Sequence, residues 1–304
     1  MFRYIQRCHR KEVASKEGVE HWRLRETIVV TRGCLLCLFL FFGIIAGVGP
    51  AGTALASDPP TVGQSPSVNS ADALPDAPGS ANSLTELSLP LEILKDQIPI
   101  WTSPVRIRTH DLRWLLPLGA ATGVALATDT DVMRDVSRER SFNKDNVNAA
   151  NVLLGGEIAI PVGLYGFGLL NGNAHGRETG ILSAEALADS VVLEQVGKII
   201  FRRERPLYND AAGDFFAPHV GANGSFPSSH SMLAWTLAGV VTAEYPSKWV
   251  QVGMCTIASG VSLTRVLGQE HFPSDVLIGA VTGWMIGHYV FEKHQVKHIS
   301  KSKR

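Results

Sequence analysis

The sequence predicts an all-α protein whose main domain is a bundle of six helices. From about Asp111 onward, apolar segments recur between polar joints, and proline or charged clusters stand at their ends. Glycine and alanine are abundant in these segments, and the strict alternation of apolar and polar residues that is typical of half-buried strands is absent. We expect helices over 114–127, 152–170, 181–201, 230–245, 248–264 and 274–291.

The composition limits the possible classes of function. With 304 residues, of which 45% are hydrophobic and 18% charged, the chain can bury a substantial core and does not belong to the disordered class. Its formal net charge is zero. Because no overall positive field attracts nucleic acid, we expect no nucleic-acid partner.

The N-terminal region, residues 1–56, is typical of an exported or membrane-anchored protein. Eight Lys or Arg residues, against four Glu, precede an uncharged hydrophobic run at 33–49. This order places the basic side in the cytoplasm, and the small residues at 54–57 offer a cleavage site for a signal peptide. A cleaved signal and a retained anchor both remain open. Either one directs the following residues out of the cytoplasm, so we expect a cell-envelope protein whose active site faces the periplasm or the outside.

The remaining boundaries follow from composition. Residues 57–100 are rich in Pro, Ser, Ala and Asp and have no apolar periodicity, which predicts a disordered linker. The helical domain is then expected over 101–292, followed by a basic tail at 293–304. We expect the membrane to be a partner of this protein. The number of spanning helices stays open, because a spanning helix needs about 20 apolar residues and the uncharged runs here are shorter.

Small residues recur every fourth position in the last predicted helix, at Gly279, Gly283 and Gly287. Such a stripe places the small residues on one face of a helix. It predicts close packing against a neighbouring helix.

Three polar clusters lie at the ends of the predicted helices. The first, KIIFRRERP at 198–206, has Lys198 and Arg205 seven residues apart, so a continuous helix ending at Pro206 would place both cations on one face. Taken alone, this pattern equally fits a basic helix end that complements the helix dipole.

The second cluster is GSFPSSHS at 224–231. Pro227 can occupy the first turn of a helix, which leaves the backbone N–H groups near Ser228 and Ser229 free to bind an anion. His230 would then stand beside that anion. A proline and two serines at a helix start are common, so alone this cluster also fits an ordinary cap with a partly buried histidine.

The third cluster is RVLGQEHFPSD at 265–275. Asp275 lies four residues after His271, where it can accept the N–H of the histidine ring and fix its tautomer. Arg265 ends the preceding helix and offers a planar fork of donors that suits phosphate oxygens. Individually these residues also fit a cap, an ion pair and a surface histidine. One His and one Asp are too few ligands for a metal site.

Together the clusters supply cations, histidines, a carboxylate and a helix N-terminus, all at helix ends that a bundle can bring to one side. This set suits phosphoryl transfer without a metal. Cations and amides stabilise the phosphoryl oxygens, one histidine attacks phosphorus, and another protonates the leaving oxygen.

The three clusters resemble the signature of the type 2 phosphatidic acid phosphatase superfamily, which also contains class A acid phosphatases and vanadium haloperoxidases. The matching patterns are K-x6-RP at 198–206, PSSH at 227–230 and TR-x5-H-x3-D at 264–275. The helical architecture extends the resemblance to about 110–292. Two positions depart from the usual pattern, because Ser229 replaces a glycine and Thr264 replaces a serine.

The resemblance implies a role for each matching residue. His271 would be the nucleophile that forms a phosphohistidine, Asp275 would orient it, and His230 would be the general acid. The residues that would hold the phosphoryl oxygens are Lys198, Arg205, Arg265, Ser228 and Ser229. No metal or other cofactor is implied, since the cations take the electrostatic role. Glu270 matches no signature position, so we expect it to be replaceable.

The favoured function is therefore hydrolysis of a phosphomonoester or pyrophosphate, with a lipid phosphate as the expected substrate because the site would open beside apolar helices. A vanadate-dependent haloperoxidase with the same site is one alternative, although the chain is short for that branch. A noncatalytic envelope scaffold is another. It would have no use for several buried unpaired cations, which are costly without an anion. The leaving group is left open.

Overall fold

All six predicted helices are present. The computed structural model describes residues 86–301, with side chains as far as Gln295. Most of these helices extend beyond the apolar runs that predicted them. They are α3 (Leu112–Asp135), α4 (Arg140–Asn171), α5 (Ala174–Phe201), α6 (Ser229–Glu244), α7 (Lys248–Leu267) and α8 (Pro273–Lys301). The prediction of an all-α fold is confirmed for the described residues.

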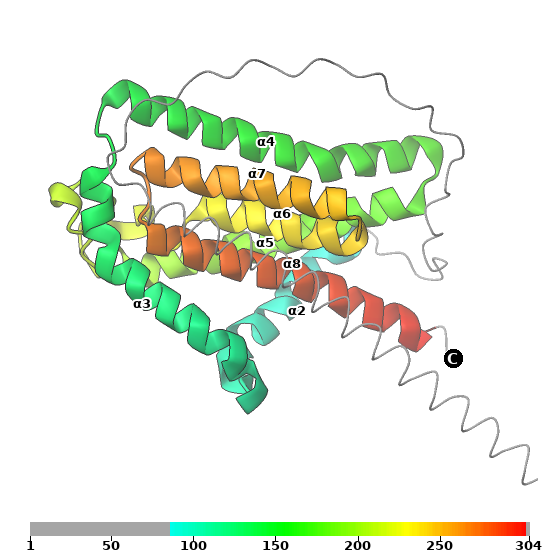
Figure 1. Cartoon of the computed structure of the whole chain (residues 1–304). Helices are drawn as coiled ribbons and strands as arrows, with labels where there is room; N and C mark the ends of the chain where they lie inside the picture. The colour runs from blue at the N-terminus through cyan, green and yellow to red at the C-terminus, as the bar shows by residue number, and fades with distance from the viewer. Residues whose placement is uncertain (1–85, 302–304) are drawn as a thin grey trace, which may run out of the picture. The chain divides into compact units, whose positions relative to one another are not determined.

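Helix α6 is the centre of the bundle. It is buried along nearly its whole length and packs against α5, α7 and α8, while α4 packs on the outer side of α5 and α7. Figure 1 shows α4, α7, α6 and α8 running side by side, with α3 at an angle to them. Because α6 is apolar on all sides, it has no face suited to water, as expected for a core helix.

The glycine stripe of α8 lies directly on α6. A Cβ atom added at Gly279 would lie 2.7 Å from the carbonyl oxygen of Ser228, and at Gly283 and Gly287 it would come closer still to backbone oxygens of α6. The prediction of close helix packing is therefore confirmed. One consequence is that the starts of the two helices meet, and the Ser228 N–H donates to the carbonyl oxygen of Asp275 at 3.1 Å.

The predicted linker extends too far toward the C-terminus. A helix, α2 (Leu89–Thr102), occupies the end of the 57–100 segment and packs against α5. Its polar side chains hold it there, since Gln97 donates to Asp189 at 2.8 Å and Asp96 pairs with Lys293 at 2.5 Å. These partners are about a hundred residues or more away, so the local composition could not indicate them. Residues 1–85, including the predicted leader, lie outside the described residues.

The predicted tail also begins too early, because α8 continues to Lys301. Lys293 pairs with Glu185 at 2.9 Å, and the buried His294 ring contacts the same carboxylate at 3.0 Å. These two basic residues therefore bind the end of α8 to α5. Residues 302–304 are not described.

Two helices in the described part, α4 and α7, are long and apolar enough to cross a membrane. Helix α4 keeps Val162, Phe167 and Leu170 more than half exposed. Large apolar side chains in such a position suit an apolar environment.

Candidate active site

The predicted site residues gather where four helices begin or end. Lys198 lies in the last turn of α5 and Arg265 in the last turn of α7, whereas Ser228 caps α6 and Asp275 lies in the first turn of α8. His271 belongs to the short turn between α7 and α8. Contacts among these segments, described below, bring together residues that are far apart in the sequence.

His271 is buried, with 1% of its surface exposed, and its tautomer is fixed by a backbone carbonyl. Nδ1 lies 2.7 Å from the carbonyl oxygen of Ser225. A carbonyl oxygen only accepts, so in the neutral ring the proton is on Nδ1 and Nε2 carries the lone pair. The expectation that Asp275 accepts this proton is not met, because its nearer oxygen is 3.8 Å from Nδ1. No side-chain pattern in the sequence indicates Ser225, because it acts through its backbone carbonyl oxygen.

Burial lowers the pKa of His271 to about 3, and the positive charges of Arg265 and Arg205 reinforce this effect against the opposing influence of Asp275. The ring is therefore neutral at ordinary pH. A neutral imidazole with an unprotonated Nε2 is the form that can attack phosphorus.

Asp275 is held by a second buried ion pair that the signature does not include. Arg203 donates to Asp275 at 2.6 Å and to Asp129 of α3 at 2.7 Å. Its guanidinium also lies 3.9 Å from the ring centre of Phe272 and 4.6 Å from that of Phe215. Arg203 is thus held by two carboxylates and by two aromatic rings. In this position it orients the Asp275 carboxylate.

The same carboxylate accepts the Phe272 N–H at 2.9 Å. Burial alone would raise the pKa of Asp275, but His271, Arg203 and this N–H outweigh it and lower the pKa. Asp275 therefore stays ionised close to His271, where its negative charge favours an imidazolium.

The α5 helix ends where the apolar run at 181–201 ends and does not continue to Pro206. It stops at Phe201, because Arg202 adopts a left-handed conformation with φ 40° and ψ 47°. The following residues instead pair with the next loop, where the Ser225 N–H donates to the carbonyl oxygen of Arg203 at 2.8 Å. Arg205 consequently reaches the site from a loop, and the prediction of one continuous helix through Lys198 and Arg205 is wrong.

Ser229, which replaces the usual glycine, has a defined partner set. Its hydroxyl accepts from Lys198 Nζ at 2.7 Å and donates to Glu194 Oε1 at 2.6 Å, while Lys198 also pairs with Glu194 at 2.7 Å. The hydroxyl therefore closes a triangle that fixes the lysine ammonium at the start of α6. Glu194 was not among the predicted site residues.

Glu270 lies between the two predicted phosphate-binding arginines. Its Oε2 atom contacts Arg205 Nη1, and it lies 3.3 Å from Arg265 Nη2. Arg205 also donates through Nε to the carbonyl oxygen of Asn223 at 3.3 Å. Glu270 therefore lies within the cluster, and the expectation that it is replaceable stays a prediction. The residue lies next to His271 in a tight turn, and only the fold shows that its side chain points toward both arginines.

Two polar atoms in this region have no partner. Arg265 Nε and Ser228 Oγ are both buried and lack a hydrogen-bond partner among the described residues. A buried unsatisfied donor costs about 1–3 kcal/mol, so such atoms commonly belong to sites that a ligand completes. The first-turn amides of α6, including that of Ser229, likewise have no acceptor within the helix, although the Ser228 N–H is already used. Together these groups suit an anion.

His230 stands in the first turn of α6 and contacts a residue that the sequence did not indicate. Its Nε2 lies 2.8 Å from Asn151 Oδ1 of α4. Burial lowers the pKa of His230 to about 4, and the nearby charges of Arg265, Lys198 and Arg205 lower it further in the same direction. All three cations therefore act on His230, which is neutral at ordinary pH.

Part of the chain matches a known protein family. Residues 179–299 match the PAP2 superfamily, the name under which the type 2 phosphatidic acid phosphatases are grouped. The predicted family resemblance is confirmed.

Two relatives of this PAP2 region are informative. The lipid A 1-phosphatase of Porphyromonas gingivalis is 28% identical over 187 residues, which is 60% of this chain and 38% of that protein. The similarity thus spans well under half of the relative's length. A solved structure, the first transmembrane PAP2-type phosphatidylglycerolphosphate phosphatase from Bacillus subtilis, is 21% identical and covers 69% of this chain and 95% of its own, with a TM-score of 0.39.

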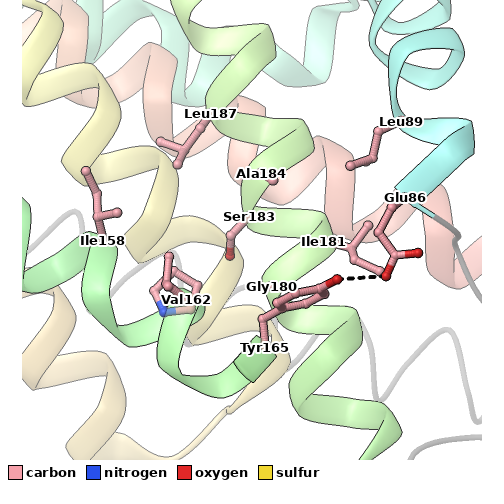
Figure 2. A pocket seen from close by; sticks show the side chains of 11 residues that line it. Glu86, Leu89, Ile158, Val162, Tyr165, Gly180, Ile181, Ser183, Ala184 and Leu187 are labelled. Atoms are coloured by element: carbon pink, nitrogen blue, oxygen red, sulfur yellow. Dashed lines mark hydrogen bonds between the residues drawn. The ribbon is translucent and has the colours of Figure 1, made fainter. Parts of the chain in front are cut away.

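An apolar pocket of about 220 Å³ lies apart from the predicted catalytic residues. Its walls come mainly from α4 and α5, including Val162, Ile181 and Leu187, and Figure 2 shows Glu86 accepting from Tyr165 at its rim. Leu187 precedes Lys198 by eleven residues, about 16 Å along a helix. The pocket is therefore not where a phosphoryl group would meet the PAP2 signature residues.

The described residues also contain a trio with the composition of a metal site, away from the PAP2 signature. Ligand atoms of Glu92, Glu185 and His294 lie within 4.8 Å of one another. The Lys293 ammonium, however, pairs with Glu92 at 3.1 Å and Glu185 at 2.9 Å. A protein cation already balances these carboxylates, and none of the trio is a predicted active-site residue.

Proposed function

We propose that this protein is a metal-independent phosphatase that hydrolyses a phosphomonoester or pyrophosphate through a phosphohistidine. One observation carries the proposal. Buried donors without partners, Arg265 Nε and Ser228 Oγ, lie in a cluster of three cations beside the neutral, buried His271. A bound anion would accept hydrogen bonds from these donors. The unprotonated Nε2 of His271 would then be available to attack its phosphorus atom.

In the first step, His271 Nε2 forms a bond to phosphorus while the bond from phosphorus to the leaving oxygen breaks. The proton stays on Nδ1 and continues to form a hydrogen bond to the carbonyl oxygen of Ser225. The positive charge that develops on the ring is stabilised by the nearby Asp275 carboxylate. Lys198, Arg205 and Arg265 stabilise the charge on the phosphoryl oxygens, together with Ser228 and the Ser229 amide. These five groups take the electrostatic role that a metal ion has in other phosphatases.

His230 would supply the proton that the leaving oxygen needs. The ring is neutral at ordinary pH, because burial and the three cations lower its pKa. A bound phosphate dianion offsets those cations and raises the pKa, so the acid becomes protonated when substrate is present. In the second step, the same ring takes a proton from water as the water oxygen attacks phosphorus and the bond to His271 breaks.

A lipid phosphate in the cell envelope is the proposed substrate. Support comes from the two relatives, whose names describe phosphatases of lipid A and of phosphatidylglycerolphosphate, and from the two apolar helices long enough to cross a membrane. The basic N-terminal residues followed by the uncharged 33–49 run favour export or anchoring, with the active site facing the periplasm or the outside.

The proposal is tested by measuring phosphate release from phosphorylated lipids and from a soluble phosphate ester, with and without a chelator. We expect turnover that survives the chelator and falls by at least about a thousandfold in His271→Ala. His219→Ala is the matched control, because this exposed loop histidine pairs with Glu204 at 2.9 Å, is not a predicted site residue and should leave turnover unchanged when it is replaced.

The same preparations are assayed for halide oxidation with added vanadate. Halide oxidation without phosphate release would replace the phosphatase by a haloperoxidase. Absence of turnover on all substrates, together with absence of phosphate and vanadate binding, would favour a scaffold.

A further inference from the structure

Glu270 occupies the space between two arginines that the proposed phosphatase needs for its substrate. One oxygen, Oε2, contacts both Arg205 Nη1 and Arg265 Nη2. The side chain of Arg265 is 6% exposed, whereas that of Glu270 is 25% exposed. The side chain of Arg205 is 26% exposed, so Glu270 and Arg205 are the partly exposed members of this group and Arg265 is its buried member.

A phosphoryl group would compete with Glu270 for the same donors. Guanidinium groups bind carboxylate and phosphate oxygens in the same planar, charge-assisted way. Each N–H has one direction, so Arg205 Nη1 cannot serve both anions well at once. The phosphoryl group and the Glu270 carboxylate would also repel each other, because both are negatively charged and would contact the same arginines.

The other contacts of the arginines do not depend on Glu270. Arg205 is also held by the carbonyl oxygen of Asn223, and Lys198 has its own partners in Glu194 and Ser229. Arg265 keeps an unused Nε donor. Moving Glu270 outward would therefore expose the arginines to an incoming anion without dismantling the rest of the cluster.

We propose that Glu270 is a resident carboxylate that neutralises Arg205 and Arg265 in the free protein and is displaced by the phosphoryl group of the substrate. This inference rests on the proposed function. It makes Glu270 a determinant of affinity, since every ligand must break its two contacts. It also favours groups with two negative charges over those with one, and it promotes release of the product phosphate when the carboxylate returns.

The test compares the affinity for inorganic phosphate of the full-length protein and of Glu270→Gln, measured by titration calorimetry in detergent. Glutamine keeps the size of the side chain but carries no charge. Charge-assisted contacts in partly buried sites support an expectation of about tenfold tighter phosphate binding in the variant. The KM for a phosphate ester should fall in parallel, and inhibition by phosphate should become stronger. Asp145→Asn, an exposed carboxylate change on α4, is the net-charge control and should change neither quantity.

Equal or weaker phosphate binding by Glu270→Gln would overturn the inference, because it would mean that Glu270 arranges the arginines for the substrate. Thermal unfolding of both variants checks that they are folded, and the more conservative Glu270→Asp, which keeps the charge, should bind phosphate less tightly than Glu270→Gln. If neither the wild type nor Glu270→Gln binds phosphate or turns over an ester, both the proposed function and this inference are wrong. If the wild type turns over and Glu270→Gln binds no more tightly, only the inference fails.

Discussion

At the scale of single residues, the two histidines of the site are both neutral in the free protein but are prepared for different tasks. His271 is buried, and its Nδ1–H donates a hydrogen bond to the carbonyl oxygen of Ser225. His230 contacts Asn151 and stands among the three cations, so its pKa depends on whether an anion is present. In the proposed mechanism, the nucleophile His271 is therefore neutral before the ligand binds, and the acid His230 gains its proton when the ligand binds.

This difference predicts that anion binding is coupled to proton uptake. The pKa of His230 is about 4 in the free protein, lowered by burial and the three cations, and a bound anion should raise it. Between the free and the bound pKa, the site must then take up protons as the anion binds. Calorimetric titration with sulfate, which does not titrate near pH 6, in buffers of different ionisation enthalpy measures this uptake.

The control for that titration is His230→Asn, which should bind sulfate without the uptake. Proton uptake that persists in this variant would assign the titration to another group. No uptake by the wild type would show that His230 is not the ligand-charged acid.

The local sequence indicated the histidines and three cations, but not the groups that hold them. Arg203 lies within the first cluster, yet its partners Asp129 and Asp275 are 74 and 72 residues away. Ser225 acts through its backbone carbonyl, which no side-chain pattern reveals. Glu270 was set aside because it matched no signature position. Its role depends on where a tight turn directs its side chain.

At the scale of helices, the contact between α6 and α8 aligns the two halves of the site. The close approach of the backbones at Gly279, Gly283 and Gly287 sets the starts of the two helices against each other. Ser228 and His230 come from one start and Asp275 from the other. A change in this spacing would move His230, the proposed acid, relative to Asp275 and the adjacent His271, the proposed nucleophile.

We therefore predict that Gly283→Ala lowers stability and activity together. Its Cβ would meet the backbone carbonyl of Met232, and overpacking of this kind costs about 1–3 kcal/mol. Gly253→Ala in α7 is the matched control, because a Cβ there meets nothing within 4 Å, and alanine in a helix should stabilise by about 0.5–1 kcal/mol. Thermal unfolding in detergent and turnover measure both effects. Equal midpoints for the two variants would contradict this account of the interface.

Helix existence was easier to predict than helix ends. The apolar runs predict α3 to α8 but not α2. Helix α2 lies at the end of a proline-rich segment and is held by polar contacts to α5 and α8, which the apolar pattern does not indicate. The apolar run at 181–201 predicts the end of α5 correctly, but the continuation of this helix to Pro206 is wrong, because loop pairing stops it at Phe201. Both errors involve contacts that are distant in the sequence, and periodicity reports only local preference.

At the scale of the whole molecule, the PAP2 match covers 179–299, yet the described domain reaches further toward the N-terminus. Helix α3 supplies Asp129, which holds Arg203, and α4 supplies Asn151, which contacts His230. The site thus depends on helices outside the family match.

The central claim is that His271 carries the phosphoryl group during turnover. The direct measurement is to react the protein with a phosphate ester, quench in alkali, which preserves phosphohistidine, and locate the phosphoryl group by mass spectrometry of the peptides. We predict phosphorylation of His271, greater accumulation in His230→Ala because water activation is impaired, and none in His271→Ala. Sustained turnover with His271 unmodified in every quenched sample, or with the phosphoryl group on another residue, would contradict the account.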